Sequence, residues 1–194
     1  MRVLVACEYS GTVRDAFIAR GHEAMSCDLL PTDVPGPHYT GDVRDVLDYP
    51  WDLMIAHPPC TDIAVSGARH FESKRMDGRQ QSGISFVKML SKADIPRIAI
   101  ENPVGILSSL WRKPDQVVQP WQYGHPEAKA TCLWLTNLPP LQPTKVLSKP
   151  SRGYWDNQTP SGQNKLGPSA DRWKVRSATY QGIADAMADQ WGAQ

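Results

Sequence analysis

The chain has 194 residues, of which 41% are hydrophobic and 21% are charged, and its formal net charge is +1. These values are typical of one globular domain with a core of ordinary size. The small net charge gives no sign of a nucleic-acid partner, although an average can conceal a local basic patch. No apolar run approaches the length of a membrane span, so we expect no contact with a membrane.

Four cysteines are present, and they share no Cys-x-x-Cys pair and no regular spacing. This pattern indicates neither a zinc site nor a disulfide framework, and isolated thiols suit a reducing cytosol. The N-terminal residues lack the basic and then apolar layout of a signal peptide. We therefore expect a cytoplasmic protein with no cleaved leader and no bound metal.

The N-terminal residues predict a nucleoside-binding unit. Residues 2–7 form a β-branched run typical of a parallel strand, residues 12–20 carry apolar side chains at helical spacing, and residues 22–27 predict a second strand. Gly11 precedes the helix, and Asp28 follows the second strand. In a doubly wound domain, such a glycine lets the backbone approach a ligand, and such an acid binds ribose hydroxyls. Gly11 could instead be a turn residue and nothing more.

Two further regions are polar or rich in turn-forming residues. Residues 29–40 predict a proline- and glycine-rich loop, and residues 41–47 predict a short strand or a turn into a helical stub. Asp42 could reach a bound base or could cap the turn that follows it. Residues 72–83 are polar and charged and resemble a mobile loop, whereas residues 84–93 have the pattern of an amphipathic helix.

Two reactive side chains lie at the ends of predicted strands. A buried strand over 53–56 stops at two prolines, and Cys60 follows them; a strand over 95–100 is followed by Glu101. Parallel neighbours would direct this thiol and this carboxyl to one cavity, where ligands of open α/β sheets bind. The thiol can add to an electron-poor ring while the acid protonates a ring nitrogen or forms a hydrogen bond to it. Taken singly, Cys60 could be an inert buried thiol and Glu101 a solvated or capping acid.

The second half of the chain is less regular. Residues 105–112 predict a short helix, residues 117–125 are irregular, and residues 128–135 have strand character. Residues 143–176 have little apolar content and no periodicity, and residues 179–191 predict a final amphipathic helix that packs back on the sheet.

The segment 143–176 combines positive charge with interleaved aromatic side chains, which suits contact with phosphates and stacking on bases. It could also be a solvated segment that packs its aromatic side chains on the domain. We expect a catalytic and cofactor-binding domain over 1–142, a minimal basic recognition segment over 143–176 and a C-terminal helix over 177–194.

In chain order, these features resemble the motifs of the S-adenosylmethionine-dependent DNA cytosine-5 methyltransferases. The sequence Pro58-Pro59-Cys60-Thr61 matches the family's Pro-Pro-Cys-Gln loop, with threonine in place of glutamine. Glu101, with the asparagine and proline after it, matches the family's Glu-Asn-Val motif, with proline in place of valine. The likeness covers most of the chain, and the shared order of the motifs is more specific than any one of them.

The cofactor motifs resemble the family's more loosely. Only Gly11 is kept of the Phe-x-Gly-x-Gly loop, Asp28 matches the acid that binds ribose, and Gly41-Asp42 matches the Gly-Asp whose acid meets the adenine. The resemblance implies an α/β fold with a Rossmann-like, doubly wound, mostly parallel sheet of the class I methyltransferase type. The residues that it implies in binding the cofactor S-adenosylmethionine are Cys7, Ser10, Gly11, Asp28, Asp42 and Pro58.

The same resemblance implies a reaction. Cys60 would attack C6 of a cytosine in double-stranded DNA, Glu101 would hold N3 and the exocyclic amine, and C5 would take the methyl group. The target base would be flipped out of the duplex, because the thiol cannot reach C6 inside the stack. Lys129 stands where the family has an arginine that contacts the pyrimidine carbonyl, and it is a point charge rather than a planar fork.

The family's recognition domain has no full counterpart, because the segment 143–176 is too short for a domain with its own core. We therefore expect a small, phage-type monomer whose sequence recognition is short, relaxed or borrowed from a partner. Two alternatives stay open, namely the same chemistry on a free nucleotide such as dCMP and a non-catalytic relative that binds DNA or cofactor. The residues expected to contact DNA are Arg69, Arg152, Lys165, Arg172 and Arg176.

Overall fold

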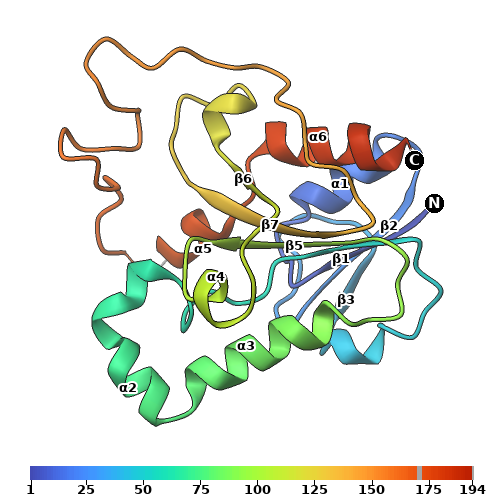
Figure 1. Ribbon diagram of the computed structural model, residues 1–194. Helices are drawn as coiled ribbons and strands as arrows, with labels where there is room; N and C mark the ends of the chain where they lie inside the picture. The colour runs from blue at the N-terminus through green and yellow to red at the C-terminus, as the bar shows by residue number, and fades with distance from the viewer. Residues whose placement is uncertain (170–171, 194) are drawn as a thin grey trace.

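The computed structural model describes residues 1–169 and 172–193, and a seven-stranded sheet forms its centre in the order β3-β2-β1-β4-β5-β7-β6 (Figure 1). The five strands from β3 to β5 are parallel, and β7 runs antiparallel to both β5 and β6. The strands are β1 (Arg2–Ala6), β2 (Glu23–Asp28), β3 (His38–Thr40), β4 (Leu53–Ala56), β5 (Ile98–Pro103), β6 (Gln116–Val118) and β7 (Thr131–Thr136).

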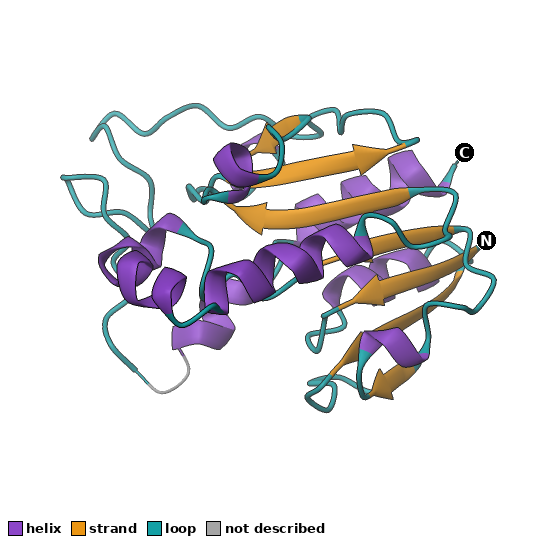
Figure 2. Cartoon of the chain, turned by 60° about the horizontal axis from the view of Figure 1, so that its bottom comes forward, coloured by secondary structure: helices purple, strands orange, loops and turns teal. Residues whose placement is uncertain are grey.

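Helices cover both faces of this sheet (Figure 2). Helices α1 and α6 lie together on one face, and α3 and α4 lie on the other (Figure 1). The helices are α1 (Thr12–Ile18), α2 (Phe71–Met76), α3 (Arg79–Leu90), α4 (Leu107–Leu110), α5 (Arg172–Ser177) and α6 (Gln181–Gly192), with 3-10 turns η1 (Val43–Asp45), η2 (Val65–His70) and η3 (Pro120–Gln122). Within the described ranges, every helix is too short or too polar to cross a membrane.

The alternation of side chains along the strands explains the two layers of helices. In β1, Val3 and Val5 belong to the core beneath α1 and α6, whereas Leu4 and Ala6 belong to the core beneath α3 and α4. A strand that is buried on both faces has a continuous apolar sequence, as β1 and β4 do. The predicted α/β, doubly wound, mostly parallel sheet is therefore confirmed.

The prediction of a loop over 72–83 is wrong. Helices α2 and α3 occupy this region, and Gly78, with a φ of 81°, separates them. The polar composition misled the prediction, because much of α2 and the first turn of α3 faces solvent. Lys74 and Gln80 are exceptions because both are buried, and the ammonium of Lys74 lies 3.2 Å from Asp62 Oδ1.

Other predicted boundaries shift by a few residues. Strand β3 lies inside the predicted loop 29–40, and its three residues are too few to show an alternating pattern. The irregular stretch 117–125 contains the end of β6 and the turn η3. Strand β5 begins at Ile98 and continues through Glu101, so the carboxyl lies within the strand rather than after it. Residues 41–47 form the predicted helical stub as η1.

Candidate functional site

The register between β4 and β5 brings two ionisable side chains together. Ala56 pairs with Ile100, so the next residues along the two parallel strands, His57 and Glu101, are neighbours. His57 Nδ1 lies 3.2 Å from Glu101 Oε2, and the two side chains are 9% and 13% exposed. The sequence prediction had placed Glu101 at the site but did not include His57.

A cavity of about 100 Å³ lies at the carboxyl ends of β1, β4 and β5. The structure brings Cys60 and Glu101 to this one cavity, as their positions on neighbouring strands predict. Residues 176–179, at and after the end of α5, close it from the C-terminal side. The predicted site residues in its lining are Cys7, Ser10, Pro58, Cys60, Glu101, Lys129 and Arg176.

Opposing influences act on the thiol of Cys60. Burial raises its pKa most, and the negative charge of Glu101 raises it further. The positive charges of Lys129 and Arg176 act in the opposite direction, but the net result is a raised pKa. The cations therefore offset only part of the cost of forming a thiolate in this cavity.

The charges of His57 and Glu101 stabilise each other. Burial alone would lower the pKa of His57, but its hydrogen bond to Glu101 and the negative charges of Glu101 and Glu8 outweigh burial and raise it. Burial likewise would raise the pKa of Glu101, yet the hydrogen bond and charge of His57, followed by the charge of Lys129, lower it. Each side chain thus favours the charged form of the other.

Two contacts hold the loop that carries Cys60. The Asn102 side chain donates from Nδ2 to the carbonyl of Pro58 at 2.8 Å in a buried hydrogen bond between β5 and this loop. On the other side of Cys60, the buried ammonium of Lys74 donates to the carbonyl of Thr61. The thiol is therefore held between the end of the sheet and helix α2.

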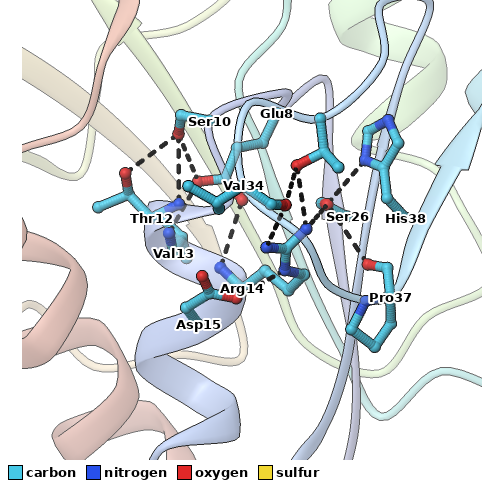
Figure 3. Close-up of polar contacts among 11 residues, drawn as sticks. Glu8, Ser10, Thr12, Val13, Arg14, Asp15, Ser26, Val34, Pro37 and His38 are labelled. Carbon is cyan, nitrogen blue, oxygen red and sulfur yellow. Dashed lines mark hydrogen bonds and ion pairs between the residues drawn. The ribbon is translucent and has the colours of Figure 1, made fainter.

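On the β1 side, Glu8 caps the N-terminus of α1. Its Oε1 accepts hydrogen bonds from the Val13 amide at 2.7 Å and from the Ser10 hydroxyl at 3.1 Å, and its Oε2 accepts from the Arg14 amide at 3.3 Å (Figure 3). A carboxylate at this position satisfies free amides and complements the helix dipole. Just before it, Cys7 has a left-handed φ of 59°, which is strained for a residue with a side chain.

Arg14 ties α1 to the loop 29–37. Its side chain is fully buried, and each of its three guanidinium nitrogens donates a hydrogen bond (Figure 3). Gly11 has a φ of 75°, and a Cβ there would overlap this guanidinium. Gly11 is therefore required for packing as well as for the turn. The acceptors of Arg14 are Asp15 Oδ1, Ser26 Oγ, Thr32 Oγ1 and the carbonyl of Val34.

The predicted cofactor acids lie near Cys7. Ala6 pairs with Cys27, so Cys7 and Asp28 follow on adjacent strands, and Asp42 comes two residues after Thr40, the partner of Asp28. Burial raises the pKa of Cys7 to about 12, and the charge of Asp28, followed by those of Cys27 and Asp42, adds to this effect. Carboxylates at the ends of neighbouring strands have the acceptor chemistry that ribose hydroxyls and an adenine amine require. Asp42 also caps η1, as the capping alternative predicts, because its Oδ1 accepts a hydrogen bond from the Arg44 amide at 3.0 Å. Its Oδ2 forms an ion pair with the Arg44 guanidinium at 2.7 Å.

The residues predicted to contact DNA divide into groups. Arg176 lines the cavity, whereas Arg69 is exposed in η2 and Arg172 begins α5. Arg152 and Lys165 lie over the ring of Tyr154, at 5.1 and 5.6 Å from its centroid. The structure thus brings only one of these predicted residues to Cys60. Residues 170–171 of the predicted recognition segment lie outside the described residues.

The segment 143–176 is anchored beside the cavity. Asn157 exchanges two hydrogen bonds with the backbone of Ala128, at 2.8 and 3.0 Å, next to Lys129. The rings of Trp155 and Trp121 stack with an interplanar angle of 3°. Part of this segment therefore packs its aromatic side chains on the domain, while Arg152 and Lys165 stay exposed at the surface.

Helix α5 covers the loop after β1, an arrangement that sequence periodicity could not reveal. The Tyr9 hydroxyl lies 3.0 Å from Ser177 Oγ, and the Tyr9 ring lies 5.6 Å from that of Trp173. Lys174 Nζ lies 3.5 Å from Asp33. Residues far apart in the sequence therefore enclose the cavity from the side of the predicted cofactor loop.

Comparison with known proteins identifies the fold. No family model and no curated protein matches this chain. Among solved structures, the chain is similar to a prophage-encoded E. coli protein provisionally named a DNA modification methyltransferase, with a TM-score of 0.50 and 17% sequence identity. The match covers 70% of this chain and 46% of the other, so this chain spans less than half of that structure. The likeness shows an α/β fold of the class I methyltransferase type.

Proposed function

We propose that this protein transfers a methyl group from S-adenosylmethionine to C5 of cytosine in DNA. The observation that carries the proposal is the meeting of Cys60 and Glu101 in one cavity, from the adjacent strands β4 and β5. Lys129 and Arg176 line the same cavity and supply positive charge. A nucleophile, an acid and two cations are the groups that attack on an electron-poor ring requires.

The chemistry begins at the thiol. The thiolate of Cys60 forms a bond from Sγ to C6, and the π electrons of the C5–C6 bond move onto the ring. Glu101 stabilises the negative charge that develops on the ring, through a hydrogen bond or a proton at N3. After C5 has been methylated, water takes the C5 proton, the electrons of that bond re-form the C5–C6 double bond, and the Sγ–C6 bond breaks, which regenerates the thiolate of Cys60. The cytosine reaches the thiol as a flipped-out base.

The residues of the β1 to β3 edge fit the cofactor. Asp28 would accept hydrogen bonds from the ribose, Asp42 would meet the adenine, and Cys7, Ser10 and Pro58 would form the wall toward Cys60. S-adenosylmethionine, when bound there, would supply the methyl group. The support for this assignment is the place of Asp28 and Asp42 at the ends of the neighbouring strands β2 and β3, and the presence of Cys7, Ser10 and Pro58 in the cavity lining.

A transfer assay tests the proposal. Wild type and Cys60→Ser receive S-adenosylmethionine with a labelled methyl group, together with duplex DNA or with dCMP, and nucleosides from the digested product are separated by chromatography. We expect the label in 5-methylcytosine from DNA, and its loss in Cys60→Ser. Label only in dCMP overturns the DNA substrate, label on a ring nitrogen or an exocyclic amine overturns C5 chemistry, and no label in either substrate overturns the activity.

A further inference from the structure

The resemblance that identifies Cys60 and Glu101 leaves His57 without a role. His57 immediately precedes the two prolines of the Cys60 loop and lines the same cavity. Its Nδ1 contacts Glu101 Oε2 at 3.2 Å, while its Nε2 is buried and has no hydrogen-bond partner among residues 1–169 and 172–193. An unpartnered nitrogen on a buried side chain costs free energy, which makes a purely structural role a poor explanation for this residue.

We propose that His57 and Glu101 share one proton, and that this proton passes from His57 through Glu101 to N3 of the cytosine. This inference rests on the proposed function and deepens it. Glu101 would be the catalytic residue that touches the base, and His57 the positioning residue that sets the orientation and protonation of Glu101.

The need for such a pair follows from the charge that the reaction creates. When Cys60 Sγ bonds to C6, the electrons displaced from the C5–C6 bond must be stabilised on the ring, and a proton at N3 does this most directly. A lone carboxylate near Lys129 is ionised at neutral pH and has no proton to give. The imidazolium beside it provides that proton at a distance of one hydrogen bond.

The proton count balances over the cycle. The shared proton moves from His57 Nδ1 to the Glu101 carboxylate and then from the resulting carboxyl to N3, which leaves a neutral imidazole, a carboxylate and a protonated N3. When the C5 proton leaves to water, its bond electrons re-form the C5–C6 double bond, Sγ leaves C6 as a thiolate, and the N3 proton returns through Glu101 to His57. The pair therefore ends the cycle in the state in which it began.

The surroundings of the pair favour this state. His57 faces Glu101 from β5, Glu8 from the loop after β1 and Lys129 from the connection before β7. Glu101 faces His57, Lys129 and the Thr131 hydroxyl, and its charge also reaches Cys60 and Cys132. Burial and the charge of Lys129 oppose a proton on the imidazole, and the charges of the two carboxylates favour it.

The first experiment follows the titration of His57 by NMR in the protein alone. In Glu101→Gln, the partner carboxylate is replaced by a neutral amide, and we expect the pKa of His57 to fall relative to wild type. Glu23→Gln, a change at an exposed carboxylate outside the cavity lining, is the matched control and should leave the pKa of His57 unchanged. An unchanged pKa of His57 in Glu101→Gln would overturn the shared proton without any reference to activity.

The second experiment measures single-turnover methyl transfer between pH 6 and pH 9.5 in wild type and His57→Asn. Asparagine keeps a donor near the position of Nδ1 but holds no titrating proton. We expect the variant to be slower by about 10- to 100-fold at pH 6.5. The ratio of wild-type to variant rate should then fall as pH rises through the pKa of His57.

The outcomes separate this inference from the proposed function. A ratio that stays constant with pH indicates a merely structural effect and overturns the shared proton, while the cytosine chemistry stands. Absence of methyl transfer in wild type overturns the proposed function and with it delivery of the proton to cytosine, whereas the NMR titration still decides whether the two side chains share a proton.

Discussion

Two buried polar clusters differ in how completely their hydrogen bonds are satisfied. The Arg14 cluster consists of Arg14 and its acceptors in α1, β2 and the loop 29–37, and every guanidinium nitrogen donates (Figure 3). The Glu101 cluster consists of His57, Cys60, Glu101 and Asn102. Within it, His57 Nε2 and Asn102 Oδ1 are buried without a partner among the residues that the structure describes.

The contrast teaches what each cluster does. Buried polar groups normally find partners, because an unsatisfied group costs about 1–3 kcal/mol. A satisfied cluster contributes to stability, and we assign that role to Arg14, which holds the loop beside Asp28. An unsatisfied cluster that lines a cavity is retained for binding or catalysis, and we assign that role to the Glu101 cluster.

The largest expected effect concerns chemistry in the Glu101 cluster. Cys60→Ser replaces the thiol by a hydroxyl that stays protonated, so we expect the rate of methyl transfer to fall by about 10³-fold or more. The matched control is Cys132→Ala, because Cys132 is buried in β7 and does not line the cavity. Equal losses in the two variants would contradict a special role for Cys60.

The next effect concerns stability in the Arg14 cluster. Arg14→Met removes the buried hydrogen bonds from the guanidinium to Ser26, Thr32 and the Val34 carbonyl, so we expect a loss of about 3 kcal/mol in the free energy of unfolding, measured by urea denaturation. Arg20→Met is the control, because Arg20 pairs with Asp189 at the surface and should lose less than about 1 kcal/mol. A loss at Arg14 that does not exceed the loss at Arg20 would remove the distinction between the clusters.

A smaller effect should appear in the reactivity of the thiol. Lys129→Met removes a positive charge that lowers the pKa of Cys60, so the thiolate fraction at pH 7.5 should decrease. We expect alkylation of Cys60 by iodoacetamide to slow by about three- to tenfold, measured by mass spectrometry of its peptide. Lys165→Met, outside the cavity lining, should leave the rate unchanged, and an unaltered rate in Lys129→Met would refute this electrostatic role.

The smallest effect is a pH dependence of stability. Because folding lowers the pKa of Glu101, this carboxyl stabilises the folded state at pH values above the ordinary glutamate pKa near 4.3. The stabilisation is lost as pH falls through the lowered pKa. Because folding raises the pKa of His57, this imidazole stabilises the folded state at pH values below the ordinary histidine pKa near 6.5. The stabilisation is lost as pH rises through the raised pKa. The advantage of wild type over His57→Asn in the free energy of unfolding should therefore be larger at pH 6 than at pH 9. Equal differences at both pH values would speak against the ion pair.

The sequence was sufficient to predict the elements with strong apolar patterns. Strands β1 and β4 and helices α1 and α6 lie within a few residues of the predicted ranges, because burial requires their side chains to be apolar at fixed spacing. The three-residue edge strand β3 and the polar helix α2 were missed. Their stability depends on pairing with β2 and on the ion pair between Lys74 and Asp62, which a local pattern does not contain.

The candidate site was predictable in part for the same reason. Cys60 and Glu101 follow apolar runs, so their place at the carboxyl edge could be inferred. The partnership of His57 with Glu101 depends on the register of β4 against β5, and a single histidine before two prolines gives no sign of it. The burial of Arg14 was also hidden, because its acceptors come from a loop that carries no pattern.

The most direct test of the Glu101 cluster as a catalytic site is a trapping experiment with duplex DNA that contains 5-fluorocytosine, in the presence of S-adenosylmethionine. Fluorine at C5 cannot leave as a proton does, so the bond between Sγ and C6 should persist and be detected by mass spectrometry on the peptide that contains Cys60. We expect this adduct in wild type and its loss in Cys60→Ser. The absence of any adduct, or an adduct on Cys7 instead, would contradict nucleophilic attack by Cys60.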